Sequence, residues 1–290
     1  MNRYFGVNSL ILAFMLLPSI LFAQQTNFQF SPPPIPWFEF EEGQKDLKIS
    51  GTLLHLAGEV EDNDPNPPDM GGDVSVYGGG VSAFFRYAFR PHFAIDIGGT
   101  VIGAGGDVGS AATMRMGMIT IPVDLEFQPI RTENIALILF GGFNLSWLFL
   151  GIDIDTGGYS AEVDLSTAMR GPQGGAQIAF KFPEWVISPF IMFSKLSGDV
   201  DFDIKDNTGT DISGSWSVTA ATAMFYGIDI VYIPLDLTLS SIIQQVSSSG
   251  NNQGYRTYVL TVSYRFQLSE PSTKAREEKP TDKRRKTTGV

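Results

Sequence analysis

Large apolar residues alternate with small or polar ones through most of the chain between residues 46 and 267. The run 134–150 reads NIALILFGGFNLSWLFL and contains no charged residue. Its odd positions are all apolar, counting Gly141, whereas the polar Asn144 and Ser146 both fall on even positions. A helix would set those two polar residues about 200° apart around its axis, whereas a strand puts them on one face. The pattern therefore favours a strand over a membrane-spanning helix.

The same two-residue sorting recurs in WSVTAATAMFYGIDIVY (216–232) and in YVLTVSYRF (258–266). Strands of a membrane barrel show this sorting because their side chains alternate between lipid and lumen. A soluble sandwich alternates too, but its exterior would carry Lys and Glu where this chain has small residues. Aromatic residues near the strand ends also favour the barrel. We therefore expect an all-β, antiparallel up-and-down transmembrane barrel, with an exported sandwich and an inner-membrane helix as the alternatives.

Both ends of the chain depart from this pattern. Residues 1–23 contain Arg3, an apolar run and Ala23 before Gln24, which fits a cleavable secretory signal peptide. Residues 24–45 are rich in proline, and we expect them to form an extended periplasmic arm. Residues 269–290 carry seven Lys and Arg against four Asp and Glu and no aromatic residue, which predicts a disordered periplasmic tail.

Long polar connections alternate with short turns along the predicted barrel domain, 46–268. Bacterial barrels have short periplasmic turns and longer outer loops, so this alternation predicts ten strands with both termini in the periplasm; eight and twelve strands are the alternatives. Pro122 and Pro189 fall inside predicted strands, where we expect bulges or distortions. The expected strands are 47–58, 74–89, 93–103, 112–127, 134–150, 172–182, 186–197, 216–232, 237–247 and 255–267.

The last predicted strand carries alternating large apolar residues that end in phenylalanine: Tyr258, Leu260, Val262, Tyr264 and Phe266. This strand resembles the terminal insertion signal of Gram-negative outer-membrane barrels, and residues 46–267 resemble the small OmpA-type and opacity-type barrel group. The resemblance implies an outer-membrane location and contacts with membrane lipid, lipopolysaccharide and the barrel-assembly machinery. The chain departs from the group in one respect, because 24 residues follow Phe266.

A set of charged residues falls on the inward face of the predicted strands, near the periplasmic end. Small barrels are largely filled by side chains, so four bases and four acids at one depth predict a lumen plugged by ion pairs. We interpret the cluster as internal packing, with a gate or proton path as the alternative. Its members are Arg86, Arg90, Asp96, Asp124, Glu126, Lys181, Asp229 and Arg265.

The predicted outer loops are strongly acidic. Loop 59–73 contains Asp62, Asp64, Asn66 and Asp73 at the first, third, fifth and twelfth places of a calcium loop, but Pro67 stands where that loop requires glycine. We therefore interpret these loops as solvated surfaces that attract divalent cations only loosely. Loop 198–215 adds further acids: Asp199, Asp201, Asp203, Asp206 and Asp211.

The sequence offers little for catalysis, cofactors or nucleic acid. His55 and His92 are its two histidines, and the chain lacks the Asp-x-His pattern of omptin-like proteases. Gly78–Gly80 and Gly98–Gly99 lie inside strand patterns and do not precede a helix, which argues against a phosphate-binding loop. We expect no enzyme activity, no cofactor, no metal site and no nucleic-acid partner. A structural or surface-interaction barrel is the favoured function, with a narrow porin-like channel or carrier for a small solute as the alternative; the outer partner stays open.

Overall fold

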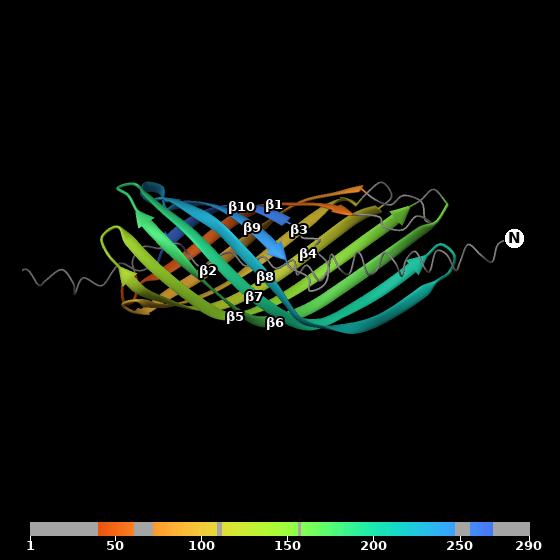
Figure 1. Cartoon of the computed structure of the whole chain (residues 1–290), viewed down its shortest axis with the longest axis horizontal. Coiled ribbons are helices and arrows are strands. Elements are labelled where there is room, and N and C mark those ends of the chain that lie inside the picture. Colours follow the sequence, from red (N-terminus) through yellow and green to blue (C-terminus); the bar gives the residue numbers. More distant parts are fainter. Residues whose placement is uncertain (1–39, 61–71, 109–111, 156–157, 247–255, 269–290) are drawn as a thin grey trace, which may run out of the picture.

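Ten strands form a closed antiparallel barrel in the computed structural model, which describes residues 40–60, 72–108, 112–155, 158–246 and 256–268 (Figure 1). Each strand pairs with its neighbours in sequence, and β1 closes the ring by pairing with β10. The predicted fold class and strand number are confirmed. The strands are β1 (Lys45–Val60), β2 (Gly72–Arg90), β3 (Phe93–Val108), β4 (Ala112–Arg131), β5 (Ile135–Asp155), β6 (Ser160–Lys181), β7 (Trp185–Asp206), β8 (Asp211–Tyr232), β9 (Leu237–Val246) and β10 (Arg256–Gln267).

The two ends of the barrel differ in their connections. One end, here called the turn end, carries the tight links between β2 and β3, β4 and β5, β6 and β7, and β8 and β9, the last through a short 3₁₀ helix, Ile233–Leu235. The opposite end is called the loop end. Among the described residues there is no helix long and apolar enough to cross a bilayer. Residues 135–150 of the run 134–150 lie in β5, as the two-residue sorting predicted.

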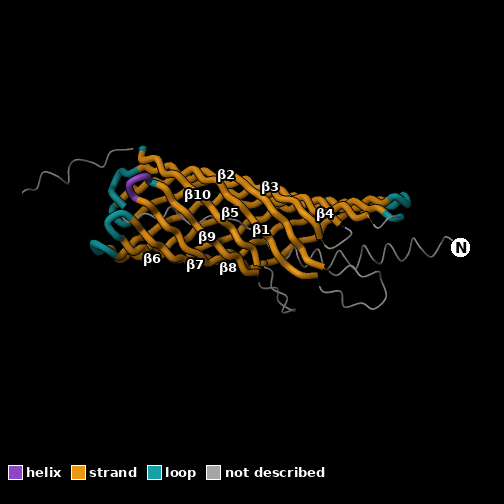
Figure 2. Tube along the Cα trace, turned by 90° about the horizontal axis from the view of Figure 1, so that it is seen from above, coloured by secondary structure: helices purple, strands orange, loops and turns teal. Residues whose placement is uncertain are grey.

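Two predicted outer loops are wrong, because most of their residues belong to strands. Residues 151–171 contain the end of β5 and the start of β6, and residues 198–215 contain the end of β7 and the start of β8. The acidity of these segments hides an alternation of apolar and polar residues, as in DVDFDIKD (199–206). The resulting extension, residues 151–155, 158–166 and 199–218, continues the sheet at the loop end beyond the shorter strands (Figures 1 and 2).

The outer wall of the barrel outside this extension is an apolar belt. On β5 the odd-numbered side chains from Ile135 to Phe149 point outward, and on β10 the five residues of the predicted insertion signal are all exposed. Aromatic rings pair at the turn end of this wall, with centroid separations of 4.5 Å for Trp185 and Tyr232 and 4.7 Å for Tyr264 and Phe266. An exposed apolar surface of this kind is stable in lipid and not in water.

Inward-facing phenylalanines pack over glycines on the neighbouring strand. Phe140 on β5 is the register partner of Gly175 on β6, and Phe190 on β7 is the partner of Gly227 on β8. A Cβ atom at Gly175 would lie 2.6 Å from the Phe140 ring, and one at Gly227 would lie 2.7 Å from the Phe190 ring. A Cβ would also meet the backbone carbonyl of Ile191 at Gly175 and that of Ser241 at Gly227, so the glycines allow both the rings and the adjacent strand to approach closely.

Neither in-strand proline produces a bulge, but the strand pairing is interrupted for two residue pairs beside each of them, which is the distortion expected. The register is unshifted from Ile97↔Val123 to Thr100↔Thr120 around Pro122, and from Gln177↔Phe190 to Phe180↔Ile187 around Pro189. Register shifts lie elsewhere, between Ala88 and Arg90, between Phe127 and Ile130, and between Leu196 and Gly198. A proline removes only one backbone donor, and here the neighbouring pairs hold the register across the gap.

Candidate functional site in the lumen

A layer of buried charged side chains crosses the lumen near the turn end. Six residues that the sequence placed there are 0–7% exposed: Arg86 on β2, Asp96 on β3, Asp124 and Glu126 on β4, Asp229 on β8 and Arg265 on β10. Strand alternation brings them inward from five different strands, and the ring of hydrogen-bonded strands brings them to one depth. This group, together with Asp46 and Lys48 of β1, is called the charge layer.

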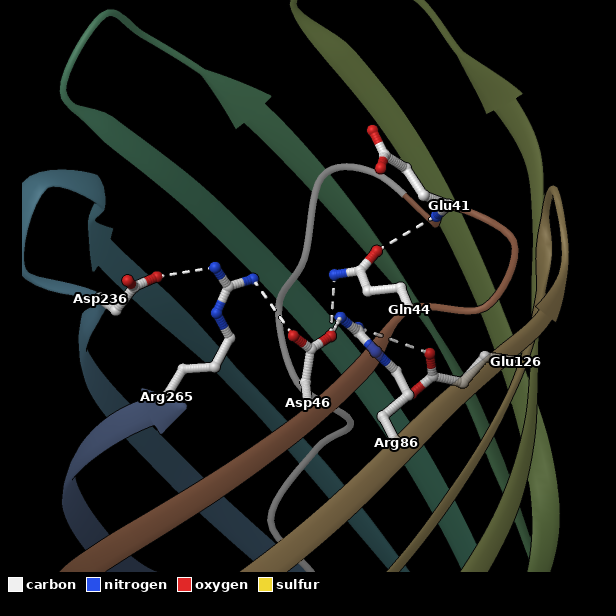
Figure 3. A network of polar contacts seen from close by, with 7 residues as sticks. All are labelled: Glu41, Gln44, Asp46, Arg86, Glu126, Asp236 and Arg265. Atoms are coloured by element: carbon white, nitrogen blue, oxygen red, sulfur yellow. Dashed lines mark hydrogen bonds and ion pairs between the residues drawn. The ribbon is translucent and has the colours of Figure 1, made fainter. Parts of the chain in front are cut away.

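Asp46 connects the two arginines of the charge layer (Figure 3). Arg86 Nη2 donates to Asp46 Oδ2 at 2.7 Å, and Arg86 Nη1 lies 3.8 Å from Glu126 Oε2. Arg265 Nη1 lies 3.8 Å from Asp46 Oδ1, and its Nη2 donates to Asp236 at 2.7 Å. The chain of ion pairs thus runs from β4 through β2 and β1 to β10 and the β8–β9 turn.

Three further charged residues lie in or beside the charge layer and were not predicted from the sequence: Asp46, Lys48 and Asp236. Asp46 and Lys48 occupy the inward positions at the start of β1, on the same face as Ser50 and Thr52. The polar alternation in KDLKISGT is the signal that could have revealed them. Lys48 is buried, with its Nζ 5.3 Å from the centroid of the Phe84 ring. No local pattern marks Asp236, because its contact with Arg265 depends on how β9 returns beside β10.

Side-chain amides complete the layer. Gln44 Nε2 donates to Asp46 at 2.9 Å, Gln173 Nε2 donates to Asp124 at 2.7 Å, and Gln177 Nε2 donates to Asp229 at 3.0 Å. A buried carboxylate is costly unless such donors and opposite charges compensate it. Gly142, the register partner of Asp124, leaves space for that carboxylate, since a Cβ at this position would lie 2.5 Å from Asp124 Oδ1.

Arg90 and Lys181 do not join the charge layer. Arg90 is exposed at the end of β2, because the register shift between Ala88 and Arg90 breaks the alternation that keeps Arg86 and Ala88 inside. Lys181 is half-buried at the last position of β6, beside the turn to β7. Among the described residues, the buried charges are therefore five acids against three bases, namely Asp46, Asp96, Asp124, Glu126 and Asp229 with Lys48, Arg86 and Arg265.

The extension differs from the belt in its outer wall. Its inner wall is apolar and continues the main buried cluster through residues such as Ile152, Val163 and Val200. Its outer wall, with Arg115 and Phe149 beside it, holds a groove of about 580 Å³. Arg115 Nη2 lies 2.9 Å from Asp153 and 3.8 Å from Glu162 on this wall. The carboxylates of the outer wall are Asp153, Asp155, Glu162, Asp164, Asp199, Asp201, Asp203 and Asp211.

The tips of the two hairpins of the extension contact each other. The Asn207 backbone N–H donates to Ser160 O at 3.0 Å, and its side chain donates to Gly158 O at 3.3 Å. Partial burial acts to raise the pKa of Asp206, but hydrogen bonds from Thr208 and Thr210 outweigh it and hold that pKa below its usual value. Burial, followed by the nearby Asp206 carboxylate, raises the pKa of Tyr159. These contacts order the far edge of the sheet.

The two histidines lie apart from the lumen. His55 stacks on Tyr77 with 4.4 Å between ring centroids, on the outer wall, and His92 occupies the turn between β2 and β3 with a φ of 73°. Within the described ranges there is no cluster of three His, Cys, Asp or Glu residues that could hold a metal ion. The calcium-loop prediction falls on residues 62–73, of which 62–71 lie outside the described residues.

No protein-family model and no curated protein sequence matches the chain. Among solved structures, outer membrane protease OmpT from Escherichia coli is similar, with a TM-score of 0.52, 10% identity, and coverage of 84% of this chain and 100% of that one. The chain has the fold of an outer-membrane β-barrel protein. At 10% identity the likeness to OmpT extends to the fold alone.

Two further outer-membrane structures are similar at lower TM-scores. The translocator domain of autotransporter NalP from Neisseria meningitidis has a TM-score of 0.43 and 12% identity over 92% of this chain and 100% of that one. The attachment invasion locus protein Ail of Yersinia pestis, in complex with a heparin analogue, has a TM-score of 0.31 and 14% identity over 78% of this chain and 99% of that one.

Proposed function

We propose that this protein is a non-conducting outer-membrane barrel that acts through the acidic sheet at its loop end. In this proposal the turn end faces the periplasm and the extension projects from the cell surface. The main support for a closed lumen is the chain of buried ion pairs from Glu126 through Arg86 and Asp46 to Arg265. A water-filled pore would leave these side chains hydrated, whereas they are almost fully buried.

The surface role is supported by the rigidity and charge of the extension. Its carboxylates stand on paired strands, and contacts between hairpin tips hold those strands together. A negative surface of this kind attracts cations and basic partners over about 8 Å at physiological salt. We propose loose divalent cations and lipopolysaccharide as its immediate neighbours, and a basic outer partner as its ligand. The exposed alternation on β10 supports recognition by the barrel-assembly machinery.

A planar-bilayer recording tests the closed lumen. The native protein, refolded and inserted, should give no steady conductance, and Arg86→Ala should lower stability without opening a channel, because the other side chains of the layer still fill the lumen. The exposed Arg115→Ala serves as the matched control. Steady large channels from the native protein would overturn the proposal.

A cell-surface binding assay tests the acidic sheet. Neutralising Glu162, Asp201 and Asp203 together to Gln and Asn should reduce retention of polylysine beads by intact cells. The control neutralises Glu41, Glu42 and Glu133, which lie at the turn end. Equal loss in both variants would show that overall charge, and not this sheet, attracts the beads.

A narrow carrier for a small solute is the second candidate, favoured by one observation. Asn144 faces the lumen, is fully buried, and neither its Oδ1 nor its Nδ2 has a hydrogen-bond partner among the described residues. Thr120 and Ser146 lie beside it, with 3.2 Å between their hydroxyl oxygens. Polar atoms in such a place suit a hydrated path. Solute uptake into liposomes in the absence of measurable conductance would favour this candidate.

A catalytic role has little support. OmpT is described as a protease, but the His55 ring of this chain packs on Tyr77 at the outer wall. We therefore propose a binding or structural function, and peptide hydrolysis by the purified native protein would overturn it.

A further inference from the structure

The inner wall of the extension and the adjoining lumen is apolar and almost completely buried. Ile152, Val163, Val200 and Ile204 are 2–4% exposed and belong to the main apolar cluster. Apolar surface gains about 25 cal/mol per Å² when it leaves water. A lumen wall of this composition is therefore stable only when apolar material covers it, unlike the hydrated wall of a pore.

The described part of the chain begins inside the lumen, at Phe40. Glu41–Gln44 form a turn, in which the Gln44 N–H donates to Glu41 O at 3.0 Å and the Gly43 N–H donates to Ala88 O at 2.8 Å. The turn reverses the chain, so that Phe40 lies inside the barrel beside Arg86, whose Cζ is 5.0 Å from the centroid of its ring (Figure 3). Phe40 is 1% exposed.

Two further contacts anchor this entry point. Phe40 packs against Ala88, Ala94 and Ile138, and Arg131 Nη1 donates to Phe40 O at 3.4 Å. Phe40, the first described residue, thus lies within the ring of strands beside the charge layer. From this turn β1 runs toward the loop end.

We propose that residues 24–39 run along the lumen from Phe40 toward the loop end and cover the apolar inner wall. The proposal rests on the closed lumen of the proposed function and identifies the segment that fills its outer half. Phe28, Phe30, Ile35, Trp37 and Phe38 supply the apolar surface. Glu39, next to Phe40, is the segment's single charged residue, so the part that reaches the apolar wall is neutral.

The length of the segment fits this course. Sixteen residues in a polyproline conformation reach about 50 Å at about 3.1 Å each. Ile138 and Ile152 lie 14 positions apart on β5 (152 − 138), which is about 46 Å along the strand and about 35 Å along a barrel axis tilted by about 40°. Prolines at 32–34 and 36 lack N–H donors, and this conformation needs no internal hydrogen bonds.

Single cysteines test the covering of the wall, because the chain has none of its own. Val163→Cys points into the lumen, and its neighbour Glu162→Cys points outward. Each is made in the full-length protein and in a variant that lacks residues 24–38 but keeps Phe40. Deletion should speed maleimide labelling of Val163→Cys at least about tenfold and leave Glu162→Cys unchanged. An unchanged Val163→Cys rate would overturn the proposal.

A second measurement uses the full-length protein alone, in case the deletion prevents folding. Phe30→Cys should react at least about tenfold more slowly with a maleimide than Ser272→Cys in the folded barrel, and at the same rate after heat unfolding. Equal rates in the folded barrel would overturn the proposal. A fast Phe30→Cys together with a slow Val163→Cys would also overturn it and would point to another apolar occupant.

Conductance separates this proposal from the proposed function. The deletion leaves Asp46, Arg86 and Arg265 in place, so the shortened protein should stay non-conducting although its inner wall has become reactive. Steady channels in the full-length protein contradict the closed lumen, whereas the labelling results above decide the position of residues 24–39.

Discussion

The belt and the extension are built from the same strands but differ in their outer walls. On β7, Ile191 and Phe193 point outward in the belt, and six to ten residues further along Asp199, Asp201 and Asp203 point outward in the extension. The inner wall of β7 mixes Ser188 and Ser194 with Phe190 and Met192 in the belt, and it continues with Val200 and Ile204 in the extension. The alternation along β7 continues across this boundary, while the outer wall changes from apolar to acidic. This change of the outer wall is the one expected where lipid gives way to water.

The largest expected change in unfolding free energy comes from the charge layer inside the belt. Arg86→Ala would leave Asp46 and Glu126 buried without their main cation, which should cost about 3–5 kcal/mol of unfolding free energy. Arg115→Ala, at an exposed pair of the extension, should cost less than about 1 kcal/mol. Urea unfolding in lipid vesicles measures both. Equal losses would mean that the charge layer is not isolated from water.

A charge placed on the outer wall of each region gives the next effect. Phe143→Arg, on the lipid side of β5, should cost about 2–4 kcal/mol because its charge would lie in the belt. Ser166→Arg, on the outer wall of the extension, should change stability by less than about 0.5 kcal/mol. The same unfolding assay reports both, and a costly Ser166→Arg would place that residue in lipid.

Packing inside the belt gives a smaller effect. Gly175→Ala puts a Cβ against both the Phe140 ring and the Ile191 backbone carbonyl, and it should cost about 1–3 kcal/mol through overpacking. The double variant Gly175→Ala with Phe140→Leu should recover part of this loss, since the shorter side chain vacates the contact. Gly158→Ala, which meets open space, is the control. Absence of any recovery would mean that the ring is not what opposes the added methyl group.

The smallest effect concerns the pH dependence of the hairpin tips. The pKa of Asp206 is lowered in the folded protein, so its contribution is present above the unfolded pKa of about 3.9 and is lost as pH falls through the lower folded value. Amide exchange at Thr208 and Thr210 should therefore rise below about pH 4, after correction for intrinsic rates. Asp206→Asn should remove this pH step, and its persistence in that variant would assign it to another group.

The sequence by itself determined the number of strands and the face on which most side chains lie. Alternation is a local property, and it identified β5, β8 and β10 and placed Asp124, Glu126 and Asp229 inside without knowledge of any neighbour. Alternation did not locate the strand ends in the extension. The acidic residues there resemble a loop unless the apolar residues that alternate with them, such as Val200 and Ile204, are also considered. Arg90 was misplaced because a register shift is invisible in composition.

Only the tertiary structure decided which charges meet. Asp46 lies between Arg86 and Arg265 because β1 closes the ring between β2 and β10, and residues 40 and 219 positions apart in the chain then share one depth. The turn formed by Glu41–Gln44 likewise places Phe40 inside the lumen beside Arg86. Pairing partners and chain direction depend on closure of the whole ring, and closure is a property of all ten strands together.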